Sequence, residues 1–273
     1  MFGNNYYCLV AGLKEYTLDS DAKGFDARAI VDEIKAEVSR DDARTIELLY
    51  GYYDALNLDG HRHGAARRYE LGNLSDEELD GPAAGLPEWM ARVVRAFGDP
   101  EGEDAETVDV QSRFDRTLLS AYYDECARSK SRFLREWSEF DRNVHNVLAA
   151  MKARKFGIPV EDAVMQGGDV ADQLMRSSAA DFGLKGELEY MDALLSAGEQ
   201  SDLLAREHKI DKIRWEKAEE LSWSNYFDID ALLAYLVKVN IVARWMRLDE
   251  KRGREMLQKL IAGLDGKELI NKQ

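Results

Sequence analysis

Residues 105–137 read AETVDVQSRFDRTLLSAYYDECARSKSRFLREW and contain neither glycine nor proline. Apolar side chains recur at every fourth position in the first part of this stretch, at Val110, Phe114, Leu118 and Tyr122. Spacings of three or four residues place side chains on one face of an α-helix. The stretch therefore predicts one long amphipathic helix, or two helices that meet near Ser129.

Helical patterns continue on both sides of this stretch. Residues 139–156 form the next pattern, which Gly157 and Pro159 should end, because glycine adopts the left-handed cap conformation and proline cannot continue a helix. Further helices are predicted at residues 25–38, 43–58, 160–175, 188–195, 199–221, 229–248 and 254–264. Gly60 is expected to end the second of these.

Local signals mark two more helix starts before residue 100. Ser75 and Glu78 have the spacing of a capping box, in which the serine accepts a backbone N–H and the glutamate reaches back to the N-terminal backbone. Pro87 precedes an apolar pattern that begins at Trp89, and the first turn of a helix tolerates proline.

The expected fold class is all-α, a multi-helix protein with roughly eight to ten helices and at most a short N-terminal strand. Residues 6–11, YYCLVA, have the length and composition of a short buried strand, although a helix start fits the same pattern. Asn143–Met151 and Asp228–Leu236 share a polar residue followed by similarly spaced apolar residues, with a fainter third copy at 44–50. This echo is a weak sign of internal repetition.

The charge is strongly acidic and unevenly distributed. The chain carries 37 Lys and Arg against 52 Asp and Glu, a net charge of −15, which repels the phosphates of nucleic acid. Residues 71–110 alone hold 11 acidic side chains against two arginines, a net charge of −9. We interpret this acidic segment as a solvated loop and helix start, or as a docking surface for a basic partner.

The expected compartment is the cytoplasm. Residues 1–5 lack the basic region of a secretory signal, and two cysteines, Cys8 and Cys126, cannot form a disulfide framework. The most apolar window near the C-terminus, residues 229–246, is interrupted by Asp230, Lys238, Asn240 and Arg244. A membrane span needs about 20 apolar residues, so membrane contact should be peripheral.

Known catalytic motifs are missing from the sequence. Residues 263–267, GLDGK, lack the spacer and the following Ser or Thr of a phosphate-binding loop, and neither G-x-G-x-x-G nor G-x-S-x-G occurs. No histidine has a glutamate three residues before it, as a di-iron helical bundle requires. We therefore expect no catalytic residue, no metal site and no cofactor site on this chain.

Two histidine arrangements are the nearest candidates for chemistry. His61 and His63 could both bind a metal only if further ligands converged on them, and they are expected to lie in a basic loop. Asp141 and His145 are one helical turn apart, which could orient a catalytic imidazole. The commoner outcome of that spacing is a hydrogen-bonded structural pair.

Other side-chain groups are interpreted as structural. Three short basic clusters are predicted to be solvated helix ends, with protein docking second and nucleic-acid binding last: Arg62/Arg67/Arg68, Lys152/Arg154/Lys155 and Lys251/Arg252/Arg254. Five aromatic residues in the last third are predicted to be core between helices: Trp215, Trp223, Tyr226, Phe227 and Trp245.

Three segments carry a family likeness: Tyr6–Leu13, Asn143–Arg154 and Asp228–Trp245. They resemble a bacterial family associated with V/A-type ATPases that looks like the counterpart of the C-type subunit, known as the d-type subunit in eukaryotes. Residues 148–154, LAAMKAR, resemble the helix in which the C-type subunit has an Asn-x-x-x-Leu-x-x-x-x-Arg-Ala-Lys-like pattern. The likeness spans nearly the whole chain, and its motifs are structural.

The resemblance implies a funnel-shaped all-α chain, residues 1–273, with related helical lobes at 1–100, 101–200 and 201–273. Such a protein is a non-catalytic central-stalk connector between the rotor shaft and the membrane ring of proteolipid subunits, in ATP-linked H⁺ or Na⁺ transport. Its ATP sites and ion-carrying carboxylates lie on other subunits. Two alternatives stay open: a free-standing adaptor that binds a basic partner through residues 71–110, and a helical enzyme that uses His145.

Overall fold

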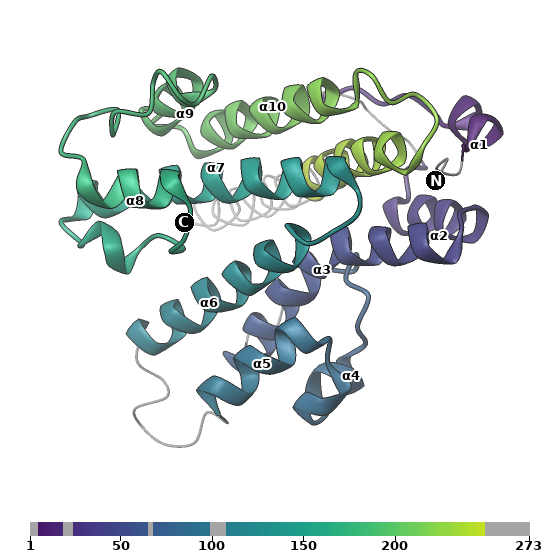
Figure 1. Ribbon diagram of the computed structural model, residues 1–273, viewed down its shortest axis with the longest axis horizontal. Helices are drawn as coiled ribbons and strands as arrows, with labels where there is room; N and C mark the ends of the chain where they lie inside the picture. Colours follow the sequence, from purple (N-terminus) through teal and green to yellow (C-terminus); the bar gives the residue numbers. More distant parts are fainter. Residues whose placement is uncertain (1–4, 19–23, 65–67, 99–107, 249–273) are drawn as a thin grey trace, which may run out of the picture.

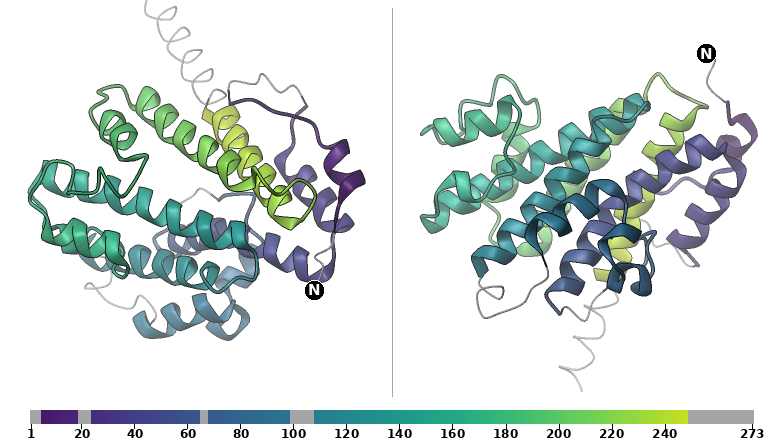
Figure 2. Two further views of the ribbon diagram at one scale, coloured as in Figure 1. Left: turned by 45° about the horizontal axis from the view of Figure 1, so that its top comes forward. Right: turned by 60° about the horizontal axis from the view of Figure 1, so that its bottom comes forward.

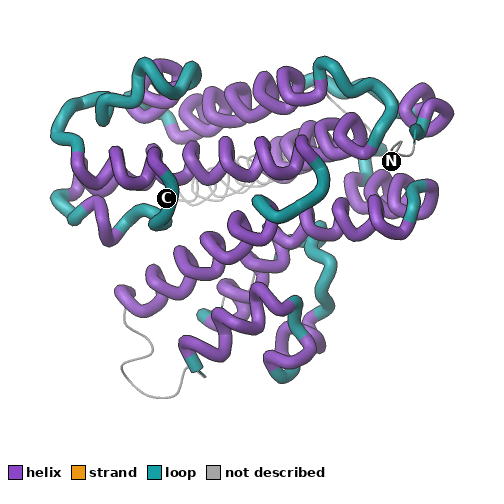
Figure 3. The backbone as a smooth tube through the Cα atoms, viewed as in Figure 1, coloured by secondary structure: helices purple, strands orange, loops and turns teal. Residues whose placement is uncertain are grey.

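The computed structural model describes residues 5–18, 24–64, 68–98 and 108–248, with side chains in the last range from residue 112 onward. Every regular element within these ranges is a helix, as Figure 3 shows, and they contain no strand. The predicted all-α fold class is confirmed.

Three long helices run side by side through the molecule (Figures 1 and 2). They are α7 (Arg132–Phe156), α10 (Leu203–Ser222) and the helix at residues 229–248, which we call the last described helix. α10 runs antiparallel to α7, because the carbonyl of Leu221 near its end accepts a hydrogen bond from Arg132 at the start of α7.

A second group of helices packs beside these three. α3 (Arg40–Arg62) packs against α6 (Val108–Cys126), which also contacts α5 (Glu88–Phe97) and α7. The shorter elements are α1 (Tyr7–Gly12), α2 (Ala27–Glu37), α4 (Asp76–Asp80), α8 (Asp169–Arg176), α9 (Met191–Gly198) and 3₁₀ turns at Ala83–Gly85 and Val160–Asp162.

Capping residues explain the confirmed helix boundaries. The Ser131 hydroxyl accepts the Leu134 N–H at 3.0 Å and starts α7, so the predicted meeting point of two helices near Ser129 is confirmed. Gly157, at φ 69°, closes the other end of α7 in the left-handed conformation. The capping box of Ser75 and Glu78 also forms, at the start of α4.

Three predicted helix boundaries are wrong. Nothing interrupts α7 near residue 139, so it continues from Arg132. α3 continues through Gly60, whose cost of about 1 kcal/mol in a helix interior is small beside the packing of a 23-residue helix. The predicted helix at 160–175 is divided, because Gly167 and Gly168 adopt φ of 96° and 88° before α8.

Of the two interpretations of residues 6–11, the short strand is wrong and the helix start is confirmed, since Tyr7–Gly12 form helix α1. A strand must pair its backbone groups with a neighbouring strand, and the described residues offer none, whereas a helix pairs its own groups. Tyr7, the first residue of α1, instead packs on a distant loop: its ring centre lies 4.4 Å from that of Phe227.

One cluster of buried apolar side chains extends from Val31 on α2 to Ala243 in the last described helix. The predicted repeat segments take different places in their helices: Asn143 lies within α7, whereas Asp228 caps the last described helix. The lobe boundaries remain a prediction, and residues 254–264 lie outside the described residues. None of the described helices is long and apolar enough to span a membrane.

Candidate functional site

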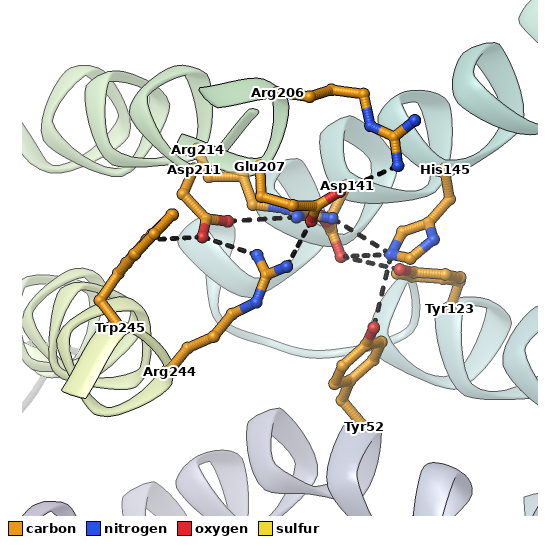
Figure 4. Close-up of polar contacts among 10 residues, drawn as sticks. All are labelled: Tyr52, Tyr123, Asp141, His145, Arg206, Glu207, Asp211, Arg214, Arg244 and Trp245. Carbon is orange, nitrogen blue, oxygen red and sulfur yellow. Dashed lines mark hydrogen bonds and ion pairs between the residues drawn. The ribbon is translucent and has the colours of Figure 1, made fainter. Parts of the chain in front are cut away.

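A cavity of about 470 Å³ lies between α3, α7, α10 and the last described helix. Its volume falls within the roughly 300–1,000 Å³ typical of small-molecule sites. Tyr52 and Tyr53 of α3 line one side. A group of ionised side chains from the three long helices lines the other, and Figure 4 shows this group with Tyr52 beneath it.

Asp141 on α7 is the first member of this group. Its carboxylate accepts hydrogen bonds from Arg214 Nε at 2.8 Å and from the Tyr123 hydroxyl at 2.7 Å. Burial by itself would raise the pKa of Asp141, but the charge of Arg214 and the two hydrogen bonds outweigh it and lower the pKa. Asp141 is therefore a buried, ionised carboxylate at neutral pH.

Asp211 on α10 is the centre of the group. Its side chain is 2% exposed and accepts hydrogen bonds from Arg244 Nη1 at 2.6 Å and Trp245 Nε1 at 2.9 Å, with Arg214 Nη1 at 3.4 Å. Arg244 also pairs with Glu207. The charges thus alternate along five side chains, which we call the ion-pair chain: Asp141, Arg214, Asp211, Arg244 and Glu207. The ion-pair chain joins three helices (Figure 4).

His145 lies at the edge of the ion-pair chain. Its Nε2 is 3.2 Å from Arg214 Nη2 and 3.5 Å from the Tyr52 hydroxyl. A guanidinium only donates, so Nε2 accepts and the imidazole is neutral. Burial is the main cause that lowers the pKa of His145, and the charges of Arg214 and Arg244 add to it, against the opposing effect of Asp141.

The structure places Asp141 and His145 near each other, but they do not bond directly; Arg214 contacts both. His145 Nε2 is 3.7 Å from Asp141 Oδ2, beyond hydrogen-bond distance, while both side chains contact the Arg214 guanidinium. Sequence reasoning missed Arg214, although its spacing of three residues from Asp211 on a helix signals an ion pair. No local sequence pattern indicates its contact with Asp141, which is 73 residues away.

The two histidines of the His61/His63 pair do not converge. His61 Nε2 pairs with Asp80, whereas His63 Nδ1 lies 3.0 Å from Asp59 Oδ1. No group of three or more His, Cys, Asp or Glu side chains in the described ranges is arranged to hold a metal ion.

The basic clusters lie apart from one another. Arg62 and Arg154 are at the ends of α3 and α7, as predicted, but both are half-buried and make specific contacts. Arg154 lies 3.6 Å from the Phe182 ring centre and donates to the carbonyl oxygens of Ser177 and Ala179. Arg62 lies 4.5 Å from the Phe114 ring centre. The predicted cluster members at 67 and 251–254 lie outside the described residues.

The prediction that all five C-terminal aromatic residues are core is wrong for the loop after α10. Trp223 is 79% exposed and Tyr226 is 61% exposed, because both lie outside the helical faces that pack against the core. Trp245 does lie between helices, where it donates to Asp211. Trp215 is half-buried, with Lys238 Nζ 5.2 Å from its ring centre.

In the acidic segment, residues 71–110, three of the described carboxylates serve local structure. Asp76 pairs with Arg68 at 2.7 Å, and Glu78 completes the capping box. Glu88 accepts from Arg95 at 2.7 Å. Residues 99–107 lie outside the described ranges, so this part of the predicted docking surface is not placed.

A family model described as a protein of unknown function, DUF2764, matches residues 3–267. A search of the curated proteins finds no match. The family description names no activity and no partner, so the resemblance to the C-type subunit of V/A-type ATPases depends on the sequence segments alone. Because the family match covers nearly the whole sequence, the chain belongs to the DUF2764 family of proteins of unknown function.

Proposed function

We propose that this protein is a non-catalytic central-stalk connector of a V/A-type ATPase, which couples the rotor shaft to the membrane proteolipid ring in ATP-linked H⁺ or Na⁺ transport. The observation that carries this proposal is the presence of two exposed apolar surfaces at opposite ends of α7. A connector needs two such surfaces and a stiff body between them.

The first surface, which we call the aromatic surface, consists of Tyr7, Trp223, Tyr226 and Phe227. It lies at the start of α7, because the residues before and after the loop at 223–228 form hydrogen bonds with Arg132 and Ser131. Arg132 Nη2 donates to the Leu221 carbonyl at 3.3 Å, and the Ser131 hydroxyl donates to Asp230 at 2.6 Å. Exposed aromatic side chains of this kind are enriched in protein interfaces.

The second surface, which we call the α7 end surface, consists of Phe156 and Ile158, which are 65% and 48% exposed. α7 has 25 residues, so its two ends are about 36 Å apart at 1.5 Å per residue. An exposed phenylalanine and isoleucine at a helix end favour contact with a second partner.

The ion-pair chain supports stiffness between the two surfaces. It fixes α7, α10 and the last described helix to one another through side chains that are mostly buried. Separating these helices would leave buried charges without partners, at a cost of several kcal/mol. Torque applied at one end would therefore reach the other end with little internal slippage.

The test is recovery of the complex from native membranes with tagged full-length protein. We expect wild type to copurify with shaft and proteolipid-ring subunits. A Trp223→Ser/Tyr226→Ser variant should lose the subunits on one side, and a Phe156→Ser/Ile158→Ser variant those on the other. Arg113→Ser, at an exposed position of α6, is the control and should recover both.

Two results would overturn the proposal. One is recovery of wild type without any ATPase subunit. The other is unchanged recovery with both surface variants. The alternatives from the sequence have their own readouts: an adaptor would copurify with a basic protein in a salt-sensitive way, and an enzyme would show a turnover that His145→Ala abolishes.

A further inference from the structure

We infer that the cavity between α3, α7, α10 and the last described helix binds a small organic anion, with one carboxylate or phosphate group on a flat body. This site is independent of the two end surfaces on which the connector role depends. Three features of the lining support it: a surplus guanidinium, an available hydroxyl and an aromatic wall.

The surplus guanidinium belongs to Arg247. The three carboxylates of the lining, Asp141, Glu207 and Asp211, are all paired with other arginines. Arg247 lies 5.7 Å from the Tyr69 ring centre and forms no ion pair with any described residue. The planar fork of arginine binds a carboxylate or phosphate with two parallel hydrogen bonds, so Arg247 is suited to an incoming anion.

The available hydroxyl belongs to Tyr53, whose ring lies 5.9 Å from that of Tyr69. Burial raises the pKa of Tyr53 to about 12, and the charges of Arg247, Arg244 and Arg214 oppose this rise. The phenol is thus protonated at neutral pH, faces positive charge, and makes no hydrogen bond within the described part of the chain. It can donate to the same anion as Arg247.

The aromatic wall gives the ligand its expected shape. Tyr52, Tyr69 and Trp137 line the cavity with Leu56 and Leu148, a lining that favours a flat apolar body. The ligand should carry a single charged group, because only one guanidinium of the lining lacks a carboxylate. A polyphosphate would bring further negative charge against Glu207 and Asp211.

Calorimetric titration of the full-length protein tests the inference. The probes are 4-hydroxybenzoate for a carboxylate on a ring, adenosine monophosphate for a phosphate with a flat base, and inorganic phosphate for the anion alone. We expect at least one of the first two to bind ten times more tightly than phosphate. The preferred probe identifies the anionic group.

Variants locate the binding. Arg247→Met should weaken the preferred probe at least tenfold, and Tyr53→Phe should weaken it at least threefold. Arg113→Met, an arginine of α6 outside the cavity, is the matched control and should bind as wild type does. Thermal unfolding without probe checks the fold of each variant. If Arg247→Met does not fold, the affinity of Tyr53→Phe for the probe decides whether binding takes place in the cavity.

Three outcomes would overturn the inference: neither flat probe binds at millimolar concentration, phosphate binds as tightly as the flat probes, or both cavity variants bind as wild type does. None of these bears on the connector proposal, because the aromatic surface and the α7 end surface do not line the cavity. Loss of copurification, in turn, would leave the binding result unchanged.

Discussion

His145 is surrounded by groups that disfavour its protonation. Burial, Arg214 and Arg244 lower its pKa, and the Asp141 charge only partly opposes them. A histidine in the unfolded chain has a pKa near about 6.5, so the unfolded state binds a proton more readily than the folded state. As the pH falls through that value, protonation of unfolded molecules draws the equilibrium toward unfolding, and stability is lost.

His145→Gln should therefore flatten the pH dependence of stability between about pH 7 and pH 5. The measurement is the free energy of unfolding in urea across this range. His61→Gln, at a position 46% exposed, is the matched control for the same substitution at the surface. Equal slopes for His145→Gln and wild type would show that His145 is not held neutral by its surroundings.

Sequence spacing could predict the proximity of Asp141 and His145, because one turn of a helix brings them together wherever that helix lies. It could not predict the role of Arg214. That role depends on a contact between α7 and α10, and helix periodicity only shows which residues face a core, not which residues they meet there.

At the scale of helices, Ser131 joins two elements. Its hydroxyl caps α7 by accepting the Leu134 N–H at 3.0 Å, and it donates to buried Asp230 of the last described helix at 2.6 Å. A serine that only capped α7 would be worth about 1 kcal/mol. Removing it also deprives Asp230 of a charge-assisted hydrogen bond.

Ser131→Ala should accordingly lower the free energy of unfolding by about 2 to 3 kcal/mol, the sum of a lost cap and an unsatisfied buried carboxylate oxygen. Ser75→Ala is the matched control, because Ser75 caps α4 at the surface and has no second partner of this kind; its cost should stay at about 1 kcal/mol or less. Urea denaturation measures both. A cost for Ser131→Ala no larger than for Ser75→Ala would contradict the joint role.

Helix ends marked by strong local chemistry were predictable from the sequence. The capping box at Ser75 and the left-handed Gly157 depend on a few neighbouring residues, so single-sequence patterns reveal them. Gly60 was misleading because tertiary packing outweighs a weak local preference. Residues 6–11 were misleading because a short apolar run does not distinguish a strand from a helix.

At the scale of the whole molecule, scarce proline and helical spacing predicted the all-α class, whereas the arrangement of the helices depends on distant pairs. Asp211 meets Arg244 across 33 residues, and Ser131 meets Asp230 across 99. Such pairs form only after the chain has folded into place. The cavity is a product of the same arrangement, since its lining comes from five separate helices and a loop.

The ion-pair chain should make α7, α10 and the last described helix open as one unit. Asp211 forms ion pairs with Arg214 and Arg244. Arg214 in turn pairs with Asp141 of α7, so Asp211 connects all three helices. Asp211→Asn removes the buried negative charge that Arg214 and Arg244 share. The free energy needed to open the three helices should therefore fall by about 3 kcal/mol.

Native-state hydrogen exchange distinguishes joint from separate opening. In Asp211→Asn, amide protection should fall by a similar factor near residues 141, 211 and 244, whereas Asp192→Asn, at a 63% exposed position of α9, should leave it unchanged. A fall confined to α10 would mean that the three helices open independently. A connector made of independently opening helices would yield under torque, so joint opening is the mechanical property that the proposed function requires.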